Sequence, residues 1–121
     1  MQGEINIDGR IVSVDILCDE YIDGDKFSDS AIQHIRNILD AEEPIRGYAA
    51  QELLQTYNDV WSREDPISAD AFAARLSIAL IGILDDPDLS TVYFNDGGLF
   101  AGHYVSVDCT GVKPSHAEIM G

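Results

Sequence analysis

The spacing of the apolar residues changes twice along this chain, and that change constrains its fold more than any other feature. Near the N-terminus, residues 4–7 and 12–16 alternate apolar and polar side chains, as half-buried strands do. Asp8 and Gly9 stand between the two runs and are typical of a tight hairpin turn. The first segment is therefore predicted to be a β-hairpin.

In the middle of the chain the apolar spacing becomes helical. Ser28 is suited to cap a first helix, whose apolar residues at 31–39 recur with a period of 3.6. Pro44 fits the first turn of a second helix, whose apolar stripe runs over 49–61. Ser68 is the expected cap of a short third helix.

The C-terminal third returns to strand-like patterns. Residues 77–84 are compatible with a helix or a buried strand, and we interpret them as a strand because turn residues follow at 85–88 and β-forming residues at 91–94. The alternating run 100–108 predicts a further strand, and 117–120 an edge strand.

The resulting order, β-β-α-α-α-β-β-β, groups the helices instead of alternating them with strands. It predicts an α+β fold in which an N-terminal hairpin and a C-terminal meander of three to four strands form an antiparallel sheet, with about three helices packed on one side. A chain of 121 residues, 45% of them apolar, can bury one core without disulfides. We expect a single domain spanning residues 1–121.

The charge balance is strongly acidic, with 22 acidic and 7 basic residues and a net charge of -15. Such a charge repels phosphate backbones and anionic lipid and speeds encounter with basic partners. We therefore expect a protein partner with a basic surface, and neither nucleic acid nor membrane. The alternative is that the acids only maintain solubility. The candidate partner-binding residues are the acids of two expected loops, Asp19, Glu20, Asp23, Asp25, Asp85, Asp86 and Asp88.

The lack of a targeting signal and the spacing of the cysteines indicate a reducing compartment. The sequence has no run of about 20 apolar residues and no signal peptide pattern at its N-terminus, so a cytoplasmic location is expected. Cys18 and Cys109 lie far apart and lack the CxxC spacing, which favours buried free thiols.

No catalytic, metal or cofactor motif stands out. Asp19–Lys26 has the composition of a calcium loop, but Tyr21 and Ser30 would occupy positions that need an oxygen donor and a bidentate glutamate. The three histidines lack the short spacing that organises a zinc site, and there is no nucleophile elbow. We therefore expect no enzyme, no cofactor and no metal. Whether His103 is structural or functional stays open.

The C-terminal segment resembles a family of small acidic bacterial domains of unknown function. The similarity lies in Leu-Phe-x-Gly-His at 99–103, which follows an acidic turn, and in Ala-x-Ile-x-Gly at 117–121. The signature positions that the resemblance implies are Phe100, Gly102, His103 and Gly121. Ala101 departs from the pattern, because relatives commonly carry a bulky aromatic residue there.

That family resembles the immunity proteins of polymorphic and contact-dependent toxin systems, which bind and block a toxin domain. The leading hypothesis is accordingly an immunity-type protein that neutralises a cognate bacterial toxin, for example a basic nuclease, by direct contact. One alternative is a non-enzymatic accessory interaction protein that forms a homodimer. A third is a metal-dependent hydrolase that uses His103.

Overall fold

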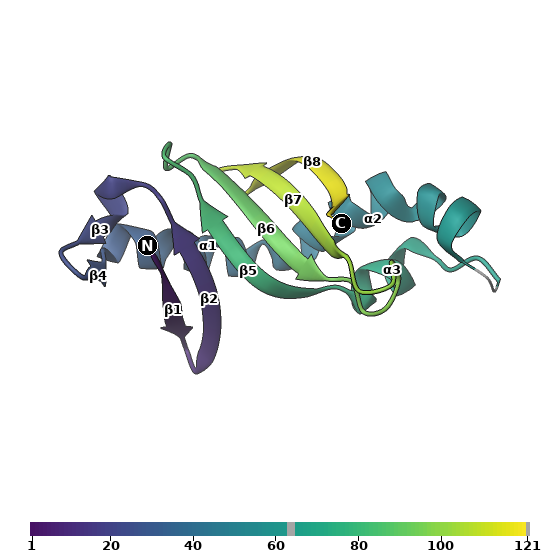
Figure 1. Cartoon of the computed structure of the whole chain (residues 1–121), viewed down its shortest axis with the longest axis horizontal. Helices are drawn as coiled ribbons and strands as arrows, with labels where there is room; N and C mark the ends of the chain where they lie inside the picture. Colours follow the sequence, from purple (N-terminus) through teal and green to yellow (C-terminus); the bar gives the residue numbers. More distant parts are fainter. Residues whose placement is uncertain (63–64, 121) are drawn as a thin grey trace.

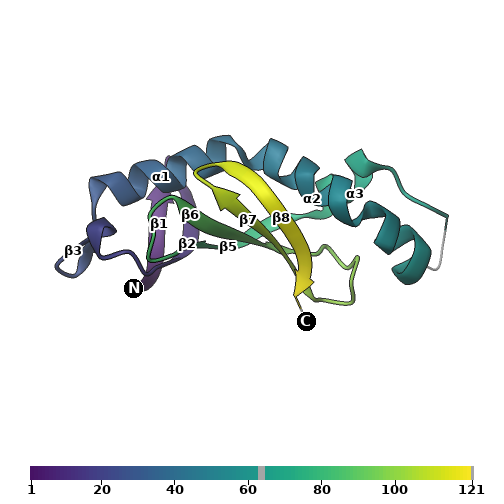
Figure 2. The same ribbon diagram turned by 90° about the horizontal axis from the view of Figure 1, so that it is seen from above.

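The computed structural model describes residues 1–62 and 65–120, and it is built around a six-stranded sheet with helices on one face (Figures 1 and 2). The strands of this sheet, in spatial order, are β1 (Gln2–Ile7), β2 (Arg10–Ile16), β5 (Ser77–Ile83), β6 (Leu89–Asn95), β7 (Tyr104–Thr110) and β8 (Lys113–Met120). The α-helices are α1 (Asp29–Asp40), α2 (Glu42–Thr56) and α3 (Ala69–Arg75). The predicted α+β fold and the predicted order of its elements are confirmed.

One pair of neighbouring strands in the sheet is parallel. Val14 and Ile16 of β2 lie opposite Ile81 and Ile83 of β5, whereas the other neighbouring pairs run antiparallel. Parallel neighbours need a long crossover connection, and here the whole helical section supplies it. The sequence predicted only antiparallel pairing, because it did not indicate where the helical section would return the chain to the sheet.

The core lies between the sheet and the helices. Alternate strand residues point towards the helices, and nearly all of these are buried. The fully buried large side chains come from both layers: Ile16, Ile81, Ile83, Val92 and Phe94 from the strands, and Ile35, Ile38, Ile45 and Phe72 from the helices. Burial of each such side chain contributes about 1.5–3 kcal/mol relative to exposure. Figure 2 shows α1 and α2 following one another across this face of the sheet.

The helices begin where the sequence predicts. The side-chain oxygens of Ser28 and Ser68 each accept a hydrogen bond from the backbone N–H three residues later, as N-caps do. Pro44 lies in the first turn of α2, where its missing N–H leaves no helical hydrogen bond unmade. The last turn of the second helix continues as a π-helical segment, η2 (Tyr57–Trp61).

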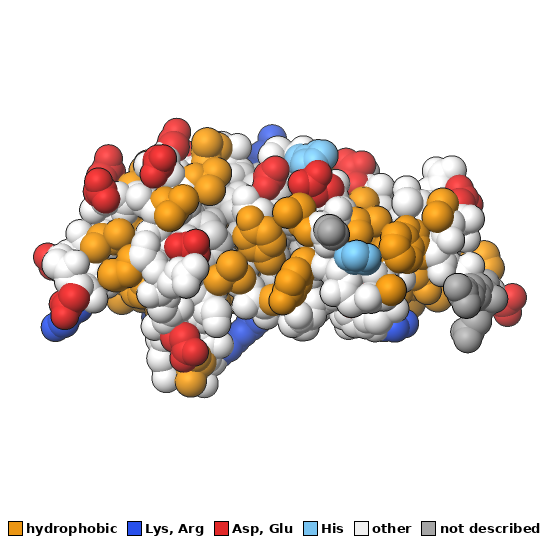
Figure 3. Space-filling model, viewed as in Figure 1, with side chains coloured by type: hydrophobic (Ala, Val, Ile, Leu, Met, Phe, Trp, Pro, Cys, Tyr) orange, Lys and Arg blue, Asp and Glu red, His pale blue; other side chains and the backbone are white. Residues whose placement is uncertain are grey.

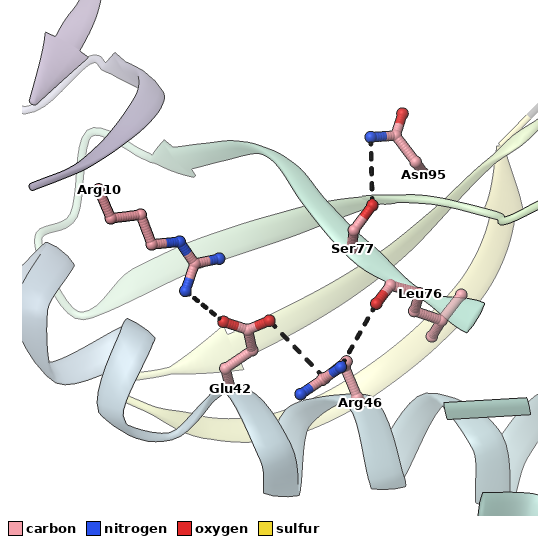
Figure 4. A network of polar contacts seen from close by, with 6 residues as sticks. All are labelled: Arg10, Glu42, Arg46, Leu76, Ser77 and Asn95. Atoms are coloured by element: carbon pink, nitrogen blue, oxygen red, sulfur yellow. Dashed lines mark hydrogen bonds and ion pairs between the residues drawn. The ribbon is translucent and has the colours of Figure 1, made fainter. Parts of the chain in front are cut away.

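A polar network joins the start of α2 to the sheet (Figure 4). Arg10 of β2 donates to Glu42 Oε1 at 2.7 Å, and the Nε of Arg46 lies 3.7 Å from Glu42 Oε2. Arg46 also donates to the backbone oxygen of Leu76, just before β5. Glu42 therefore links the N-terminal hairpin to the point where the chain enters β5.

Two expected element boundaries are wrong. The strand predicted from Phe100 begins only at Tyr104, because residues 100–102 form a turn whose amides bind a buried carboxylate. Gly102 therefore lies in a turn and not in the predicted strand. The predicted acidic loop at 19–26 contains a 3₁₀ turn, η1 (Asp19–Tyr21), and a small hairpin of β3 (Ile22–Asp23) and β4 (Lys26–Phe27).

Candidate partner-binding site

The parallel pairing of β2 and β5 places two acidic segments at the same end of the sheet. The amide of Leu17, just after β2, donates to the backbone oxygen of Ile83, the last residue of β5. The chain then enters η1 from β2 and the β5–β6 turn from β5. The acids of these two segments, which we call the acidic end, are Asp19, Glu20, Asp85, Asp86 and Asp88.

Hydrogen bonds hold the β5–β6 turn of the acidic end. Asp86 Oδ1 accepts from the amide of Asp88 at 2.9 Å, and the backbone oxygen of Asp86 accepts from the amide of Leu89 at 3.0 Å. The backbone oxygen of Asp88 accepts from the amide of Gly111 at 2.6 Å, which fastens the turn to the β7–β8 connection. The carboxylates are therefore presented from a braced turn, so binding would cost little loop ordering.

The electrostatic environment of the acidic end is uncompensated. All five of its side chains are exposed, and among the described residues none of them forms an ion pair. The pKa of the Tyr21 hydroxyl is raised, mainly by burial. The nearby negative charges of Cys18, Asp88 and Glu20 raise it further. The end is thus a local concentration of negative charge.

A hollow of about 450 Å³ lies beside the acidic end. It is bounded by α1 and by two turns, the one that contains Asp88 and the one that contains Gly111. His34 and Tyr21 are among the residues that line it. The Nδ1 of His34 lies 3.1 Å from the Tyr21 hydroxyl oxygen, and the two rings meet edge to face. The surface at this end is therefore concave as well as acidic.

The structure does not bring Asp23 and Asp25 into this cluster. They lie on the β3–β4 hairpin, where Asp23 is opposite Lys26 in the strand register. Asp25 lines a separate hollow against β1. Figure 1 shows this hairpin apart from the β5–β6 turn, with η1 between them. Of the seven candidate acids, five belong to the acidic end and two do not.

The signature residues 99–103 have a different role: they close a loop around Asp96. Asp96 is 6% exposed; its Oδ1 accepts from the amide of Gly98 at 2.9 Å, and its Oδ2 accepts from the amides of Phe100 and Gly102 at 2.8 and 2.9 Å. Burial alone raises the pKa of this carboxyl, but the amide hydrogen bonds outweigh burial and hold the pKa below its ordinary value. The sequence analysis missed Asp96, although Asp-Gly-Gly is a signal for a side chain that binds its own turn.

Phe100 anchors this loop by packing against the helices. It is fully buried, and its ring meets those of Tyr57, Trp61 and Phe72 edge to face at centroid distances of 5.3–5.9 Å. The ring of His103 packs on the other side of this group, 5.9 Å from Trp61. Phe100 thus packs against η2 and α3, and His103 packs against η2.

The backbone of the same loop has positive φ at several residues. Gly102 has φ +88° and supplies one of the amides to Asp96, while Ala101 adopts φ +57°. At Gly97, φ is +60°, and a Cβ would lie 2.3 Å from the backbone oxygen of Arg75. Gly121, the last signature position, lies outside the described residues.

Two further properties concern only the part of the chain that the structure describes. Within residues 1–62 and 65–120, no group of three or more His, Cys, Asp or Glu side chains is arranged to hold a metal ion. No helix in the same ranges is long and apolar enough to cross a membrane.

These features define a class of protein, an acidic α+β domain whose helices cover one face of a mostly antiparallel sheet. Residues 1–118 match the model of a family described as an uncharacterized protein conserved in bacteria (DUF2262). The chain belongs to this family. Neither curated proteins nor solved structures give a match.

Proposed function

We propose that this chain is an immunity-type protein that binds and neutralises a cognate bacterial toxin domain with a basic surface. The observation that carries the proposal is the acidic end, where two loops from neighbouring strands present five exposed carboxylates without basic partners among the described residues. The resemblance of the C-terminal segment to a family of small acidic bacterial domains, whose members look like immunity proteins, supports the same assignment. We also propose that the protein acts in the cytoplasm.

The physical basis of this proposal is electrostatic competition. A nuclease domain must hold a phosphate backbone in a basic cleft, and a braced set of carboxylates can occupy that cleft in its place. Because the net charge of the chain is -15, its field would also steer the encounter, by roughly 10- to 1000-fold in association rate. Neutralisation would then result from occupying the cleft, with no chemical step.

A role without catalysis is part of the proposal. Burial, together with the smaller effect of the Asp108 charge, raises the pKa of the Cys109 thiol to about 11, so the thiol stays protonated at neutral pH. Both oxygens of Asp96 are occupied by backbone amides, and His103 packs against Trp61. These side chains serve the fold, which supports a binding function.

The direct test is rescue of a sensitive bacterial host. The C-terminal domain encoded immediately upstream of this gene is expressed with and without this protein, and co-purification is then measured. We expect rescue and a stable complex. The triple variant Asp85→Asn, Asp86→Asn, Asp88→Asn should rescue poorly, because it removes three charges from the acidic end.

The matched control removes three exposed acids on the helices, Asp40→Asn, Glu43→Gln and Asp59→Asn, and changes the net charge equally. The control should rescue like the wild type. A toxic domain that kills equally with and without this protein contradicts the proposal for that pair.

A further inference from the structure

The face of the sheet opposite the helices carries a patch of exposed apolar side chains. Five of the eight exposed large hydrophobic residues in the described ranges lie there, with Tyr104 and Leu17 about half exposed, at 50% and 49%. We call these five residues, together with the half-buried Tyr93, the open-face patch: Leu17, Leu84, Leu89, Tyr93, Tyr104 and Met120. Figure 3 shows apolar side chains gathered over the middle of this face.

Strand register makes the patch continuous with the acidic end. Leu17 and Leu84 directly follow β2 and β5, where the two acidic loops begin, and Leu89 begins β6 after the acidic turn. Further along the sheet, Tyr104 lies opposite Met120 on neighbouring strands. A partner that reaches the acidic end can therefore also cover this face. Exposed apolar patches of this kind mark interaction surfaces.

The acidic residues on the same face favour a basic partner. Asp15, Asp108 and Glu118 lie on the open side of their strands, as Leu17 and Tyr104 do. Thr91 donates to Asp108 Oδ1 at 2.8 Å, which fixes this carboxylate on the face.

Two of these acids have a partner on or beside the face: the N-terminal ammonium of Met1 lies 3.9 Å from Asp15 Oδ1, and His116 Nε2 lies 3.6 Å from Glu118 Oε2. The arginines that the structure describes lie elsewhere. Arg10 and Arg46 contact Glu42 at the start of α2, Arg36 pairs with Asp8, and Arg75 donates to the backbone oxygen of Gly97 at 3.0 Å. All four are thus engaged with the helices or with the loop before β7. Lys113 and His116 of β8 also have open-face register positions. The face is apolar with an acidic border.

We infer that the open-face patch is the surface on which the basic partner domain docks. Apolar side chains of the partner pack on Leu89, Tyr93 and Tyr104, while its lysines and arginines pair with Asp15, Asp108 and Glu118. A second copy of this chain is a poor occupant, because each copy brings a net charge of -15 and the same acidic border. This inference rests on the proposed function and names its contact surface.

The test measures the dissociation constant of the complex with the upstream-encoded domain for two open-face variants, Leu89→Ser and Tyr104→Ser. Both side chains are substantially exposed, so the fold should tolerate their loss. The control is Val60→Ser, which removes an equally apolar and more exposed side chain, at 73%, from η2, away from this face. We expect each open-face variant to bind at least about ten-fold more weakly, and the control to bind like the wild type.

The outcomes separate the two proposals. Equal binding by all variants overturns the docking surface and leaves the proposed function standing. Absence of any binding by the wild type overturns the proposed function for that pair, and two synthetic peptides then decide the inference. A peptide in which leucine alternates with lysine should bind the wild type and lose affinity with Tyr104→Ser, whereas the same peptide with glutamate in place of lysine should not bind.

Failure of the lysine peptide to bind, or binding that ignores the Tyr104 substitution, overturns the inference. So does a homodimer in analytical ultracentrifugation that the Tyr104 substitution dissociates, because a second copy would then occupy the face.

Discussion

Ile16 of β2 lies opposite Ile83 of β5 in parallel register, and this pairing determines where the candidate site is built. If the two strands ran antiparallel, the segments after Ile16 and Ile83 would leave from opposite ends of the sheet, and their acids would be separated. Because the strands are parallel, Asp19 and Asp85 follow them at one end. The acidic end is therefore a product of the crossover through the helices.

Asp96→Asn should destabilise the protein. The Asp96 Oδ2 accepts two amide hydrogen bonds, and an asparagine that keeps the Gly98 contact would place an NH₂ group against the amides of Phe100 and Gly102. Loss of two charge-assisted bonds in a buried site should lower the free energy of unfolding by about 2–4 kcal/mol. Chemical denaturation measures this. Asp86→Asn is the control, because it changes an exposed carboxylate with a single amide partner and should cost less than about 1 kcal/mol.

The same carboxylate predicts a pH dependence. Its pKa is lower in the folded than in the unfolded state, so its stabilisation is present at neutral pH, above the unfolded pKa of about 4, and is lost as the pH falls through the folded pKa. The stability difference between the wild type and Asp96→Asn should therefore be largest near pH 7 and shrink in acid. A difference that grows between pH 5 and pH 3 contradicts this assignment.

Gly97→Ala should cost much more stability than Gly24→Ala. Both glycines have positive φ, +60° and +67°, so each substitution pays the left-handed penalty of about 1–2 kcal/mol. Only at Gly97 does the added Cβ also meet backbone, 2.3 Å from the oxygen of Arg75, whereas Gly24 has open space. Thermal unfolding of the two variants provides the comparison. Equal losses would show that the loop does not approach Arg75 as closely as described.

Both cysteines should resist modification in the native protein. Cys18 and Cys109 are buried, and the raised pKa of Cys109, about 11, leaves about one thiolate in a thousand at pH 8. Titration with a thiol-reactive chromophore should detect almost no reaction before denaturation and two thiols per chain after it. Rapid reaction of one thiol in the folded protein contradicts the burial.

Much of the fold could be predicted because its signals are local. The caps at Ser28 and Ser68, the turn at Asp8 and Gly9, and the strand at 77–83 each follow from a few neighbouring residues. The parallel pairing of β2 with β5 could not be predicted, because it depends on how the helices pack against the sheet. The long β8 strand was only partly foreseen, since Pro114 and Ser115 argue against a strand in isolation.

The candidate site was only partly predictable for a similar reason. The sequence identified seven acids, but tertiary contacts separate Asp23 and Asp25 from the other five. It also placed Gly102, a signature position, within a predicted strand over 100–108. The structure instead explains this glycine by the amide that it donates to Asp96, a contact between residues six apart.

The salt dependence of association tests the central claim most directly. The association rate constant of this protein with the upstream-encoded domain is measured by stopped-flow fluorescence at increasing NaCl, for the wild type and for the variant Asp85→Asn, Asp86→Asn, Asp88→Asn. Recognition through the acidic end predicts that the wild-type rate falls steeply with salt, and that the variant is slower and less salt-sensitive. A wild-type rate that does not change with salt would contradict the claim.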